Sequence, residues 1–316
     1  MGQSIAAANA AQMAAQCGRT VLWLGVETRT WQLRDWHNAA TFARSLGVDS
    51  VCGKVADGGV RWYPNGPAGL AAIRDTVHAA GAGFIPFTYC YGPKFGLQQV
   101  NDEAVILGEL LHVCPIAQAD MEAEYNGQTA AAQRFTALMR PMQGLLSVST
   151  WADPVQQAWE GVAHDLAPCV NQWVIQQYTD WLAAQEGEYD PAVFTCIAPG
   201  VDLRPEFGAD HVLNIVDAAL AHHHSTIYIW EYADAQANPQ LVRDIVARMA
   251  GHPAPPPVNT PTPAPAPSGS YVRVMPGNTL SGLAFAHHVT VAALLAANPF
   301  ITNPNYIQAG WTLRIP

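Results

Sequence analysis

Three carboxylates stand at alternate positions in the segment AQADMEAEYNG, residues 117–127, directly after the short apolar run VCPIA. They are Asp120, Glu122 and Glu124. On an extended strand, residues two apart share a face, so the three side chains point together if the strand runs that far. Neighbouring carboxylates raise one another's proton affinity, which lets one remain an acid while another stays ionised. Glycoside hydrolysis uses such a pair, about 5 to 5.5 Å apart for retention and about 6.5 to 9.5 Å apart for inversion.

The same carboxylates also fit the start of a helix. The segment NGQTAAAQRF follows them, and the N-terminal end of a helix dipole favours negative charge. The surrounding elements decide between the two interpretations, because catalytic groups need a scaffold that brings them to a cleft.

Short apolar runs alternate with segments of helical periodicity through residues 1–252. The predicted strands are VLWLGVE from Val21, SVCGKVAD from Ser50, GFIPFTYCY from Gly83, CPIAQADME from Cys114, LLSVST from Leu145, QWVIQQY from Gln172, AVFTCIA from Ala192 and TIYIWEY from Thr226. Such alternation implies a parallel sheet with right-handed crossovers. Eight units predict an α/β fold of the (β/α)8 TIM-barrel type, and a doubly wound open sheet is the alternative.

Polar and aromatic residues follow most of these strands. In a TIM barrel the functional groups project from the carboxyl ends of the strands, so these positions predict the mouth of a site. Beside the acidic triplet, the candidate catalytic residues are Glu27, Asp57 and Asp202. The candidate substrate-binding residues are Tyr89, Tyr91, Trp151, Gln177, Tyr178 and Glu231.

Charge and composition exclude several classes of partner. The formal net charge is -10, and the chain from Pro253 onward contains no Asp, Glu or Lys. Phosphate-binding proteins select basic faces, so neither nucleic acid nor an acidic membrane is expected as a partner. No apolar run reaches the length of a membrane span, and the first residues do not form a signal peptide.

Metal and cofactor sites are not predicted either. The six cysteines lack CxxC spacing and are expected to be free and buried. His222, His223 and His224 close a predicted helix, and consecutive helical residues diverge rather than converge on a metal. The segment GKVADGG is not a phosphate loop, because its lysine precedes the glycines.

Residues 253–270, PAPPPVNTPTPAPAPSGS, are too rich in proline for a helix or a central strand. They predict an extended linker that rises about 3.1 Å per residue. The remaining residues, 271–316, resemble a LysM module over their full length, in YVRVMPGNTLSGLA, VTVAALLAANP and NYIQAGWTLRIP. That resemblance implies a small α+β domain with the order strand, helix, helix, strand.

LysM modules bind glycans that contain N-acetylglucosamine, so the resemblance implies such a glycan as the partner. By position, the groove uses Gly277, Asn278, Thr279, Leu280, Asn298, Pro299, Phe300 and Ile301. Asn278 replaces the usual Asp of the G-D-T-L turn, and all of these residues also suit the turns of the fold.

The barrel region resembles glycoside hydrolases, most specifically the family-25 lysozymes. LGVETRTWQ resembles that family's first strand, GKVADGG its second, and ADMEAEYN contains the D-x-E signature of its fourth. The resemblance implies Glu122 as general acid assisted by Asp120. Glu27 stands where an Asp is usual, and Asp202 in PGVDLRPEF is the candidate for the family's late Asp.

A second alignment is open, because DMEAEY also resembles the D-x-D-x-E-Y ending of family-18 chitinases. That register implies Glu124 as the acid and Glu122 as its support. Together these features predict a peptidoglycan-directed, muramidase-like hydrolase that acts at the cell wall, as a phage-type lysin or as a virion or surface component. The alternative is a non-catalytic, glycan-binding structural protein with a degenerate barrel.

Overall fold

The computed structural model describes residues 12–150, 157–176, 189–190 and 192–251, and, further along the chain, 270–274, 280, 283, 289, 291–298, 301 and 312–315. The chain divides into two compact units, Met1–Pro257 and Val258–Pro316. The division falls inside the proline-rich segment 253–270. The exact ends of the predicted linker stay a prediction, since residues 252–269 lie outside those described.

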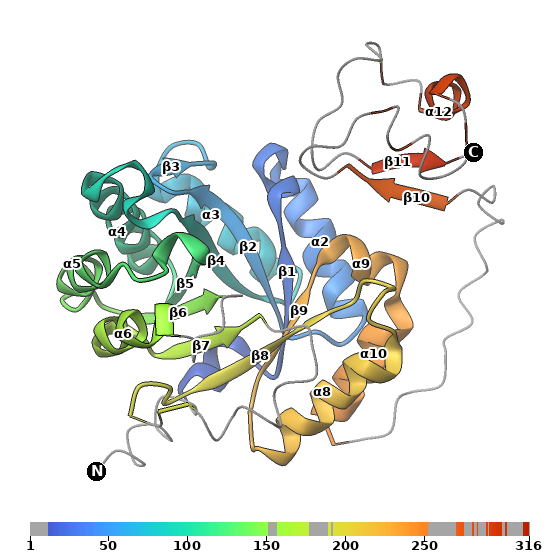
Figure 1. Cartoon of the computed structure of the whole chain (residues 1–316). Helices are drawn as coiled ribbons and strands as arrows, with labels where there is room; N and C mark the ends of the chain where they lie inside the picture. The colour runs from blue at the N-terminus through green and yellow to red at the C-terminus, as the bar shows by residue number, and fades with distance from the viewer. Residues whose placement is uncertain are drawn as a thin grey trace. The chain divides into compact units, whose positions relative to one another are not determined.

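Eight parallel strands close into a ring in the described part of the first unit (Figure 1). They are β1 (Thr20–Leu24), β2 (Ser50–Asp57), β4 (Gly83–Cys90), β5 (Ile116–Met121), β6 (Leu145–Thr150), β7 (Gln172–Ile175), β8 (Ile197–Asp202) and β9 (Ile227–Trp230). β1 pairs with both β2 and β9, so the sheet has no open edge between its first and last strands. This closure confirms the predicted TIM barrel and excludes the open sheet.

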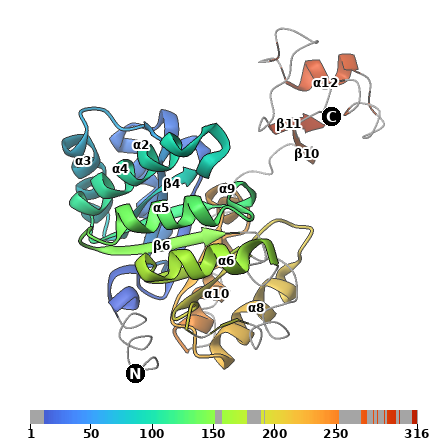
Figure 2. The same cartoon turned by 60° about the vertical axis from the view of Figure 1, so that its left-hand side comes forward.

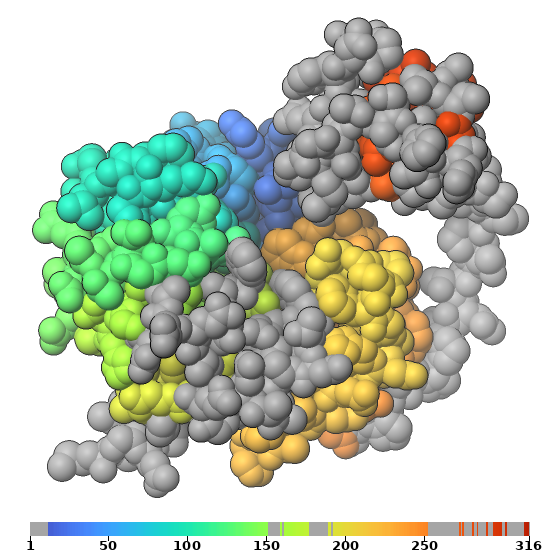
Figure 3. All heavy atoms as spheres, viewed as in Figure 1, coloured from blue at the N-terminus to red at the C-terminus, as the bar shows by residue number. Residues whose placement is uncertain are grey.

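The helices lie outside the ring of strands, as Figures 1 and 2 show. They are α2 (Leu33–Ser45), α3 (Pro67–Ala79), α4 (Leu97–Val113), α5 (Thr129–Met139), α6 (Gln157–Leu166), α8 (Ala209–Ala221), α9 (Tyr232–Ala237) and α10 (Pro239–Met249). Short 3-10 helices also occur among the described residues: η1 (Val26–Thr30), η2 (Gly92–Phe95), η3 (Ala123–Tyr125) and η4 (Ala167–Cys169). Much of the surface seen in Figure 3 is formed by α4, α5 and α8.

Both faces of the strands are buried, which is why they read as continuous apolar runs. All five residues of β1, TVLWL, are buried. One cluster, which includes Trp23, Ile85 and Tyr228, fills the inside of the ring, and a larger cluster lies between strands and helices. All six cysteines are free, and only Cys169 is more than slightly exposed.

The seventh barrel strand is shifted from its predicted position. The run AVFTCIA from Ala192 was expected to form it, but β8 begins at Ile197 and ends at Asp202. Residues before it form a turn in which Phe194 packs on Trp173, with ring centroids 5.0 Å apart. The residues up to Cys196 therefore precede the strand, and the last two residues of the run, Ile197 and Ala198, form it together with the PGVD segment that follows.

Other strands, β1 and β5 among them, end earlier than predicted. β1 ends at Leu24, so Glu27 lies in η1. β5 ends at Met121, and Glu122 is the residue that precedes η3. The extended alternation expected for the acidic triplet therefore stops after Asp120.

The second unit contains an antiparallel pair, β10 (Ser270–Arg273) with β11 (Thr312–Ile315), and a helix, α12 (Val291–Ala297). Asn298 links α12 to β11. Its side-chain amide donates to the carbonyls of Leu294 in α12 and Arg314 in β11, each at 2.8 Å. Most of the predicted first helix lies outside the described residues. Throughout those residues, no helix has the length and apolar character that crossing a membrane requires.

Candidate active site at the carboxyl ends of the strands

Asp120 is held at the end of β5 by two side chains from neighbouring strands. Its Oδ1 accepts hydrogen bonds from Ser149 Oγ at 2.8 Å and Gln176 Nε2 at 2.9 Å, and only 6% of the residue is exposed. Burial raises the pKa of Asp120 to about 6, although these hydrogen bonds and the charge of Lys54 oppose the shift.

Glu122 and Glu124 converge on one phenol. The hydroxyl of Tyr89, near the end of β4, lies 3.3 Å from Glu122 Oε2 and 2.8 Å from Glu124 Oε2. One hydroxyl carries one hydrogen, so it donates to one carboxylate at a time. The two glutamates are thus brought together although the strand has ended, because η3 turns the chain between them.

The ionisation of this group is set by its neighbours. Burial acts to raise the pKa of Glu124, but hydrogen bonds from Tyr89 and Lys94 outweigh it and hold that pKa below its ordinary value. Lys94 Nζ lies 3.2 Å from Glu124 Oε1. Burial, reinforced by the charges of Glu122 and Glu124, raises the pKa of Tyr89, so the phenol keeps its proton and acts as a donor.

The end of β2 supplies an ion pair beside the acidic group. Lys54 Nζ lies 2.8 Å from Asp57 Oδ1, and the hydroxyl of Tyr91 donates to Asp57 Oδ2 at 3.2 Å. The Lys54 ammonium also lies 5.3 Å from the ring centre of Tyr89. Asp57, Tyr89 and Tyr91 therefore join the triplet in one connected cluster, and their role in binding or catalysis stays a prediction.

Glu27 and Glu231 gather on the other side of the mouth, around Gly25. A Cβ built on Gly25 would lie 3.0 Å from Glu231 Oε2 and 3.1 Å from Glu27 Oε2, so glycine leaves the space that both carboxylates use. Gly25 N also donates to Glu27 Oε1 at 2.8 Å.

Asp202 ends β8 with its side chain fully buried. Both of its oxygens accept from Arg204, one from the backbone N at 2.9 Å and the other from the guanidinium Nε at 2.7 Å. Asp202 is the last residue of its strand, as predicted, but the guanidinium of Arg204 neutralises its carboxylate.

The structure does not test several of the predicted site residues. Trp151, Gln177, Tyr178, Gly277, Asn278, Thr279, Pro299 and Phe300 lie outside the described residues. Leu280, Asn298 and Ile301 are described, and all three are buried within the second unit. Their positions support the fold, and their role in glycan binding stays a prediction.

The three histidines lie at the end of α8, where a helix terminus was expected. His222 and His224 stack with ring centroids 6.5 Å apart. Burial, with the neighbouring histidines, lowers the pKa of His224 to about 4. Within the described ranges, no group of three or more His, Cys, Asp or Glu side chains is arranged to hold a metal ion.

Sequence reasoning missed Glu103, a fully buried carboxylate in α4. Its Oε1 accepts from the backbone N–H groups of Tyr91 at 2.6 Å and Gly92 at 3.1 Å, and its Oε2 accepts from the Tyr125 hydroxyl at 3.2 Å. It therefore fixes the loop after β4 to the turn after β5. A helical Glu among polar neighbours gives no sequence signal for this role.

Glu103→Gln is expected to change the pH dependence of stability. Burial raises the pKa of Glu103 from 4.5 to about 7, so the folded state binds its proton more tightly than the unfolded chain. The unfolding free energy of the native protein should fall between about pH 4.5 and 7, by about 3 kcal/mol at most from this group. Gln cannot ionise, so the variant should gain stability relative to the native protein as pH rises through this window. Urea unfolding at pH 5 and pH 8 measures the difference.

Glu109→Gln, on the same helix, is the matched control. The pKa of Glu109 is lowered, chiefly by hydrogen bonds from Arg61. Removal of the Glu109 charge should therefore not give the same gain in unfolding free energy as pH rises. Equal pH profiles for the native protein and Glu103→Gln would show that the pKa of Glu103 is not raised in the folded state.

The comparisons with known proteins separate the two units. The model of the LysM family matches residues 272–316. The C-terminal unit is a LysM domain. An endolysin of Bacillus phage PZA is 45% identical over 47 residues, which are 15% of this chain and 18% of the endolysin. The match therefore spans less than a fifth of that curated relative.

The barrel that precedes the LysM domain is similar to solved structures at low identity. The spore cortex-lytic enzyme SleL of Bacillus cereus aligns with a TM-score of 0.51 and 11% identity, over 71% of this chain and 73% of SleL. The endo-1,4-beta-mannanase of Rhizomucor miehei aligns with a TM-score of 0.54 and 8% identity, over 74% of this chain and 94% of the mannanase. These similarities show that the fold is shared.

Proposed function

We propose that the protein is a glycosidase that cleaves the glycan of peptidoglycan, held at the cell wall by its LysM domain. The observation that carries the proposal is the convergence of Glu122 and Glu124 on the Tyr89 hydroxyl, at the carboxyl ends of TIM-barrel strands. Paired carboxylates in this position suit acid-assisted cleavage of a glycosidic bond.

In the proposed mechanism Glu122 is the general acid. Lys94 and Tyr89 hold Glu124 as a carboxylate, which leaves Glu122 as the glutamate of this pair that we assign as the proton donor. Glu122 protonates the leaving oxygen as the glycosidic bond breaks, and the Glu124 carboxylate stabilises the positive charge that develops on the sugar ring. Water then adds to the anomeric carbon and returns its proton to Glu122, which completes the hydrolysis. The alternative register exchanges these roles and makes Glu124 the acid.

The remaining groups act on this pair. Asp120 is buried with Ser149 and Gln176, and its charge is coupled to those of Lys54 and Glu124. Tyr89 fixes both glutamates, and Lys94 fixes Glu124 alone. In this scheme they position and tune the carboxylates and do not touch the reacting bond.

The LysM domain supports a wall glycan as the substrate, since such modules bind polymers that contain N-acetylglucosamine. Two of the similar proteins, an endolysin and a spore cortex-lytic enzyme, carry names of wall-lytic proteins. We propose further that the bond cleaved is the one that a muramidase cleaves.

Release of new reducing ends from purified peptidoglycan by the full chain tests the function, with chitin as the comparison polymer. Borohydride reduction followed by mass spectrometry identifies the sugar at each new end. Reduced N-acetylmuramic acid from peptidoglycan supports the muramidase assignment, and reduced N-acetylglucosamine from peptidoglycan assigns the other bond. New ends from chitin but not from peptidoglycan support the chitinase-like alignment. The absence of new ends from both polymers would reject the enzyme.

A second candidate is a glycan-binding protein without catalysis. It is favoured by the cationic partners of three acids at the mouth of the barrel. These ion pairs are Lys54–Asp57, Lys94–Glu124 and Arg204–Asp202. Such pairing leaves fewer carboxylates available for chemistry. Sedimentation with peptidoglycan without any release of reducing ends would support this candidate.

A further inference from the structure

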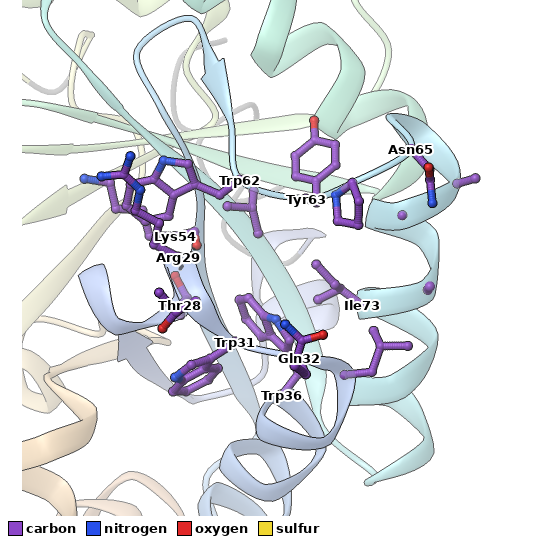
Figure 4. Close-up of a pocket in the computed structure, with 17 residues that line it drawn as sticks. Thr28, Arg29, Trp31, Gln32, Trp36, Lys54, Trp62, Tyr63, Asn65 and Ile73 are labelled. Atoms are coloured by element: carbon purple, nitrogen blue, oxygen red, sulfur yellow. Dashed lines mark hydrogen bonds between the residues drawn. The ribbon is translucent and has the colours of Figure 1, made fainter.

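A cavity of about 360 Å³ lies beside the carboxylate cluster, between the loop after β1 and the loop after β2 (Figure 4). Its lining includes four aromatic side chains and two cations: Trp31, Trp36, Trp62, Tyr63, Arg29 and Lys54. No sequence pattern pointed to it, because its walls come from segments about thirty residues apart in the chain.

The aromatic walls are held in place by packing. Trp36 is only 2% exposed and meets Trp31 edge-on, with ring centroids 5.2 Å apart. The buried Tyr63 donates its hydroxyl to Glu109 at 2.6 Å. Trp31 and Trp62 are half-buried, so part of each ring remains available to a ligand. A concave site with rigid aromatic walls and a few polar groups is the usual form of a small-ligand site.

The polar groups at this cavity give it a charge preference. Arg29 and Lys54 both lie over Trp62, at 5.7 and 4.9 Å from the ring centre, and Figure 4 shows them together at one end. Lys54 is neutralised by Asp57 at 2.8 Å. Arg29 is exposed, and none of the ion pairs between described residues includes it. A guanidinium is suited to bidentate binding of a carboxylate.

Lys54 also connects the cavity with the catalytic cluster. Its ammonium lies 4.9 Å from the ring centre of Trp62, in the cavity, and 5.3 Å from that of Tyr89, which contacts Glu122 and Glu124. A saccharide chain that reaches Tyr89 can therefore continue past Lys54 to Trp62.

We propose that this cavity is a subsite for a sugar that bears a carboxylate, with the ring on Trp62 and Trp31 and the carboxylate on Arg29. The proposal rests on the proposed function and specifies its substrate class. In peptidoglycan such a carboxylate belongs either to the lactyl group of N-acetylmuramic acid or to the attached peptide. Chitin has neither group, so the cavity distinguishes the two polymers.

Equilibrium titration of the full chain tests the subsite without any need for turnover. The ligands are N-acetylmuramic acid, muramyl dipeptide, whose lactyl group is amidated, and the neutral N-acetylglucosamine. Arg29→Gln is expected to weaken binding of the carboxylate ligand about tenfold to a hundredfold, the size of a lost charge-assisted hydrogen bond, and to leave N-acetylglucosamine unaffected. The ligand that loses affinity identifies the source of the carboxylate.

Arg34→Gln is the matched control, because Arg34 is a highly exposed arginine nearby in the chain that does not line the cavity. It should bind all three ligands as the native protein does. Equal affinities of Arg29→Gln and Arg34→Gln for both carboxylate ligands, or no binding of these ligands to the native protein, would overturn the subsite.

The outcome is separable from that of the proposed function. Binding that depends on Arg29, in a protein that releases no reducing ends, would keep the subsite and reject the enzyme. Release of reducing ends by a protein in which Arg29→Gln changes no affinity would keep the enzyme and reject the subsite.

Discussion

Glu122→Gln is expected to lower kcat/KM on peptidoglycan by about 10²- to 10⁴-fold, the usual contribution of a general acid. The amide matches the carboxyl group in shape but has no proton to deliver to the leaving oxygen. Because Glu122 is only half-buried, the variant should fold as the native protein does. Initial rates of reducing-end release measure the loss, and thermal unfolding verifies the fold.

Two further variants identify the acid. Glu124→Gln should lose less activity than Glu122→Gln if Glu124 only supplies negative charge, and more if the alternative register is right. Glu206→Gln removes an exposed acid from the loop after β8 and should retain full activity. Full activity in both Glu122→Gln and Glu124→Gln would place the chemistry elsewhere.

Removal of the LysM domain by truncation after Pro257 is expected to reduce hydrolysis of insoluble peptidoglycan about a hundredfold at low enzyme concentration. The tether makes the second binding event intramolecular, and such linkage raises apparent affinity by about 10²- to 10⁴-fold. The barrel should survive truncation, because the LysM core of Val274, Leu294, Leu313 and Ile315 is a separate cluster.

Soluble peptidoglycan fragments provide the control for this truncation. Their hydrolysis needs no attachment to a surface, so the shortened protein and the full chain should give equal rates. Equal rates on the insoluble polymer as well would show that the LysM domain does not deliver the barrel to its substrate.

The sequence was informative where one physical requirement dominated. Strands buried on both faces must be apolar, so runs such as VLWL and FIPF were placed correctly. The exception was AVFTCIA, most of which precedes the strand in a turn where Phe194 packs on Trp173. Apolar content reports burial, and it does not distinguish a strand from a packed turn.

The site was less predictable because its geometry depends on contacts between distant segments. The alternation of Asp120, Glu122 and Glu124 indicated a shared face, yet β5 ends at Met121 and a phenol from β4 brings the two glutamates together. Glu103 was missed for the same reason, since its partners lie in two loops and its own helix shows an ordinary polar pattern. Asp202 was named, but its neutralisation by Arg204 depends on the local turn.

The buried free thiols of the barrel can report on transient opening of its structure. Cys52 and Cys90 have no exposed surface in the folded chain, and burial raises the pKa of both thiols well above 9. Since the thiolate is the reactive form, an alkylating reagent can modify these positions only when the packing around them opens. For Cys52, inside the ring, the strands must separate, and for Cys90 the layer between strands and helices must open. The time course of alkylation therefore measures how often the barrel opens, and it uses only cysteines that the chain already contains.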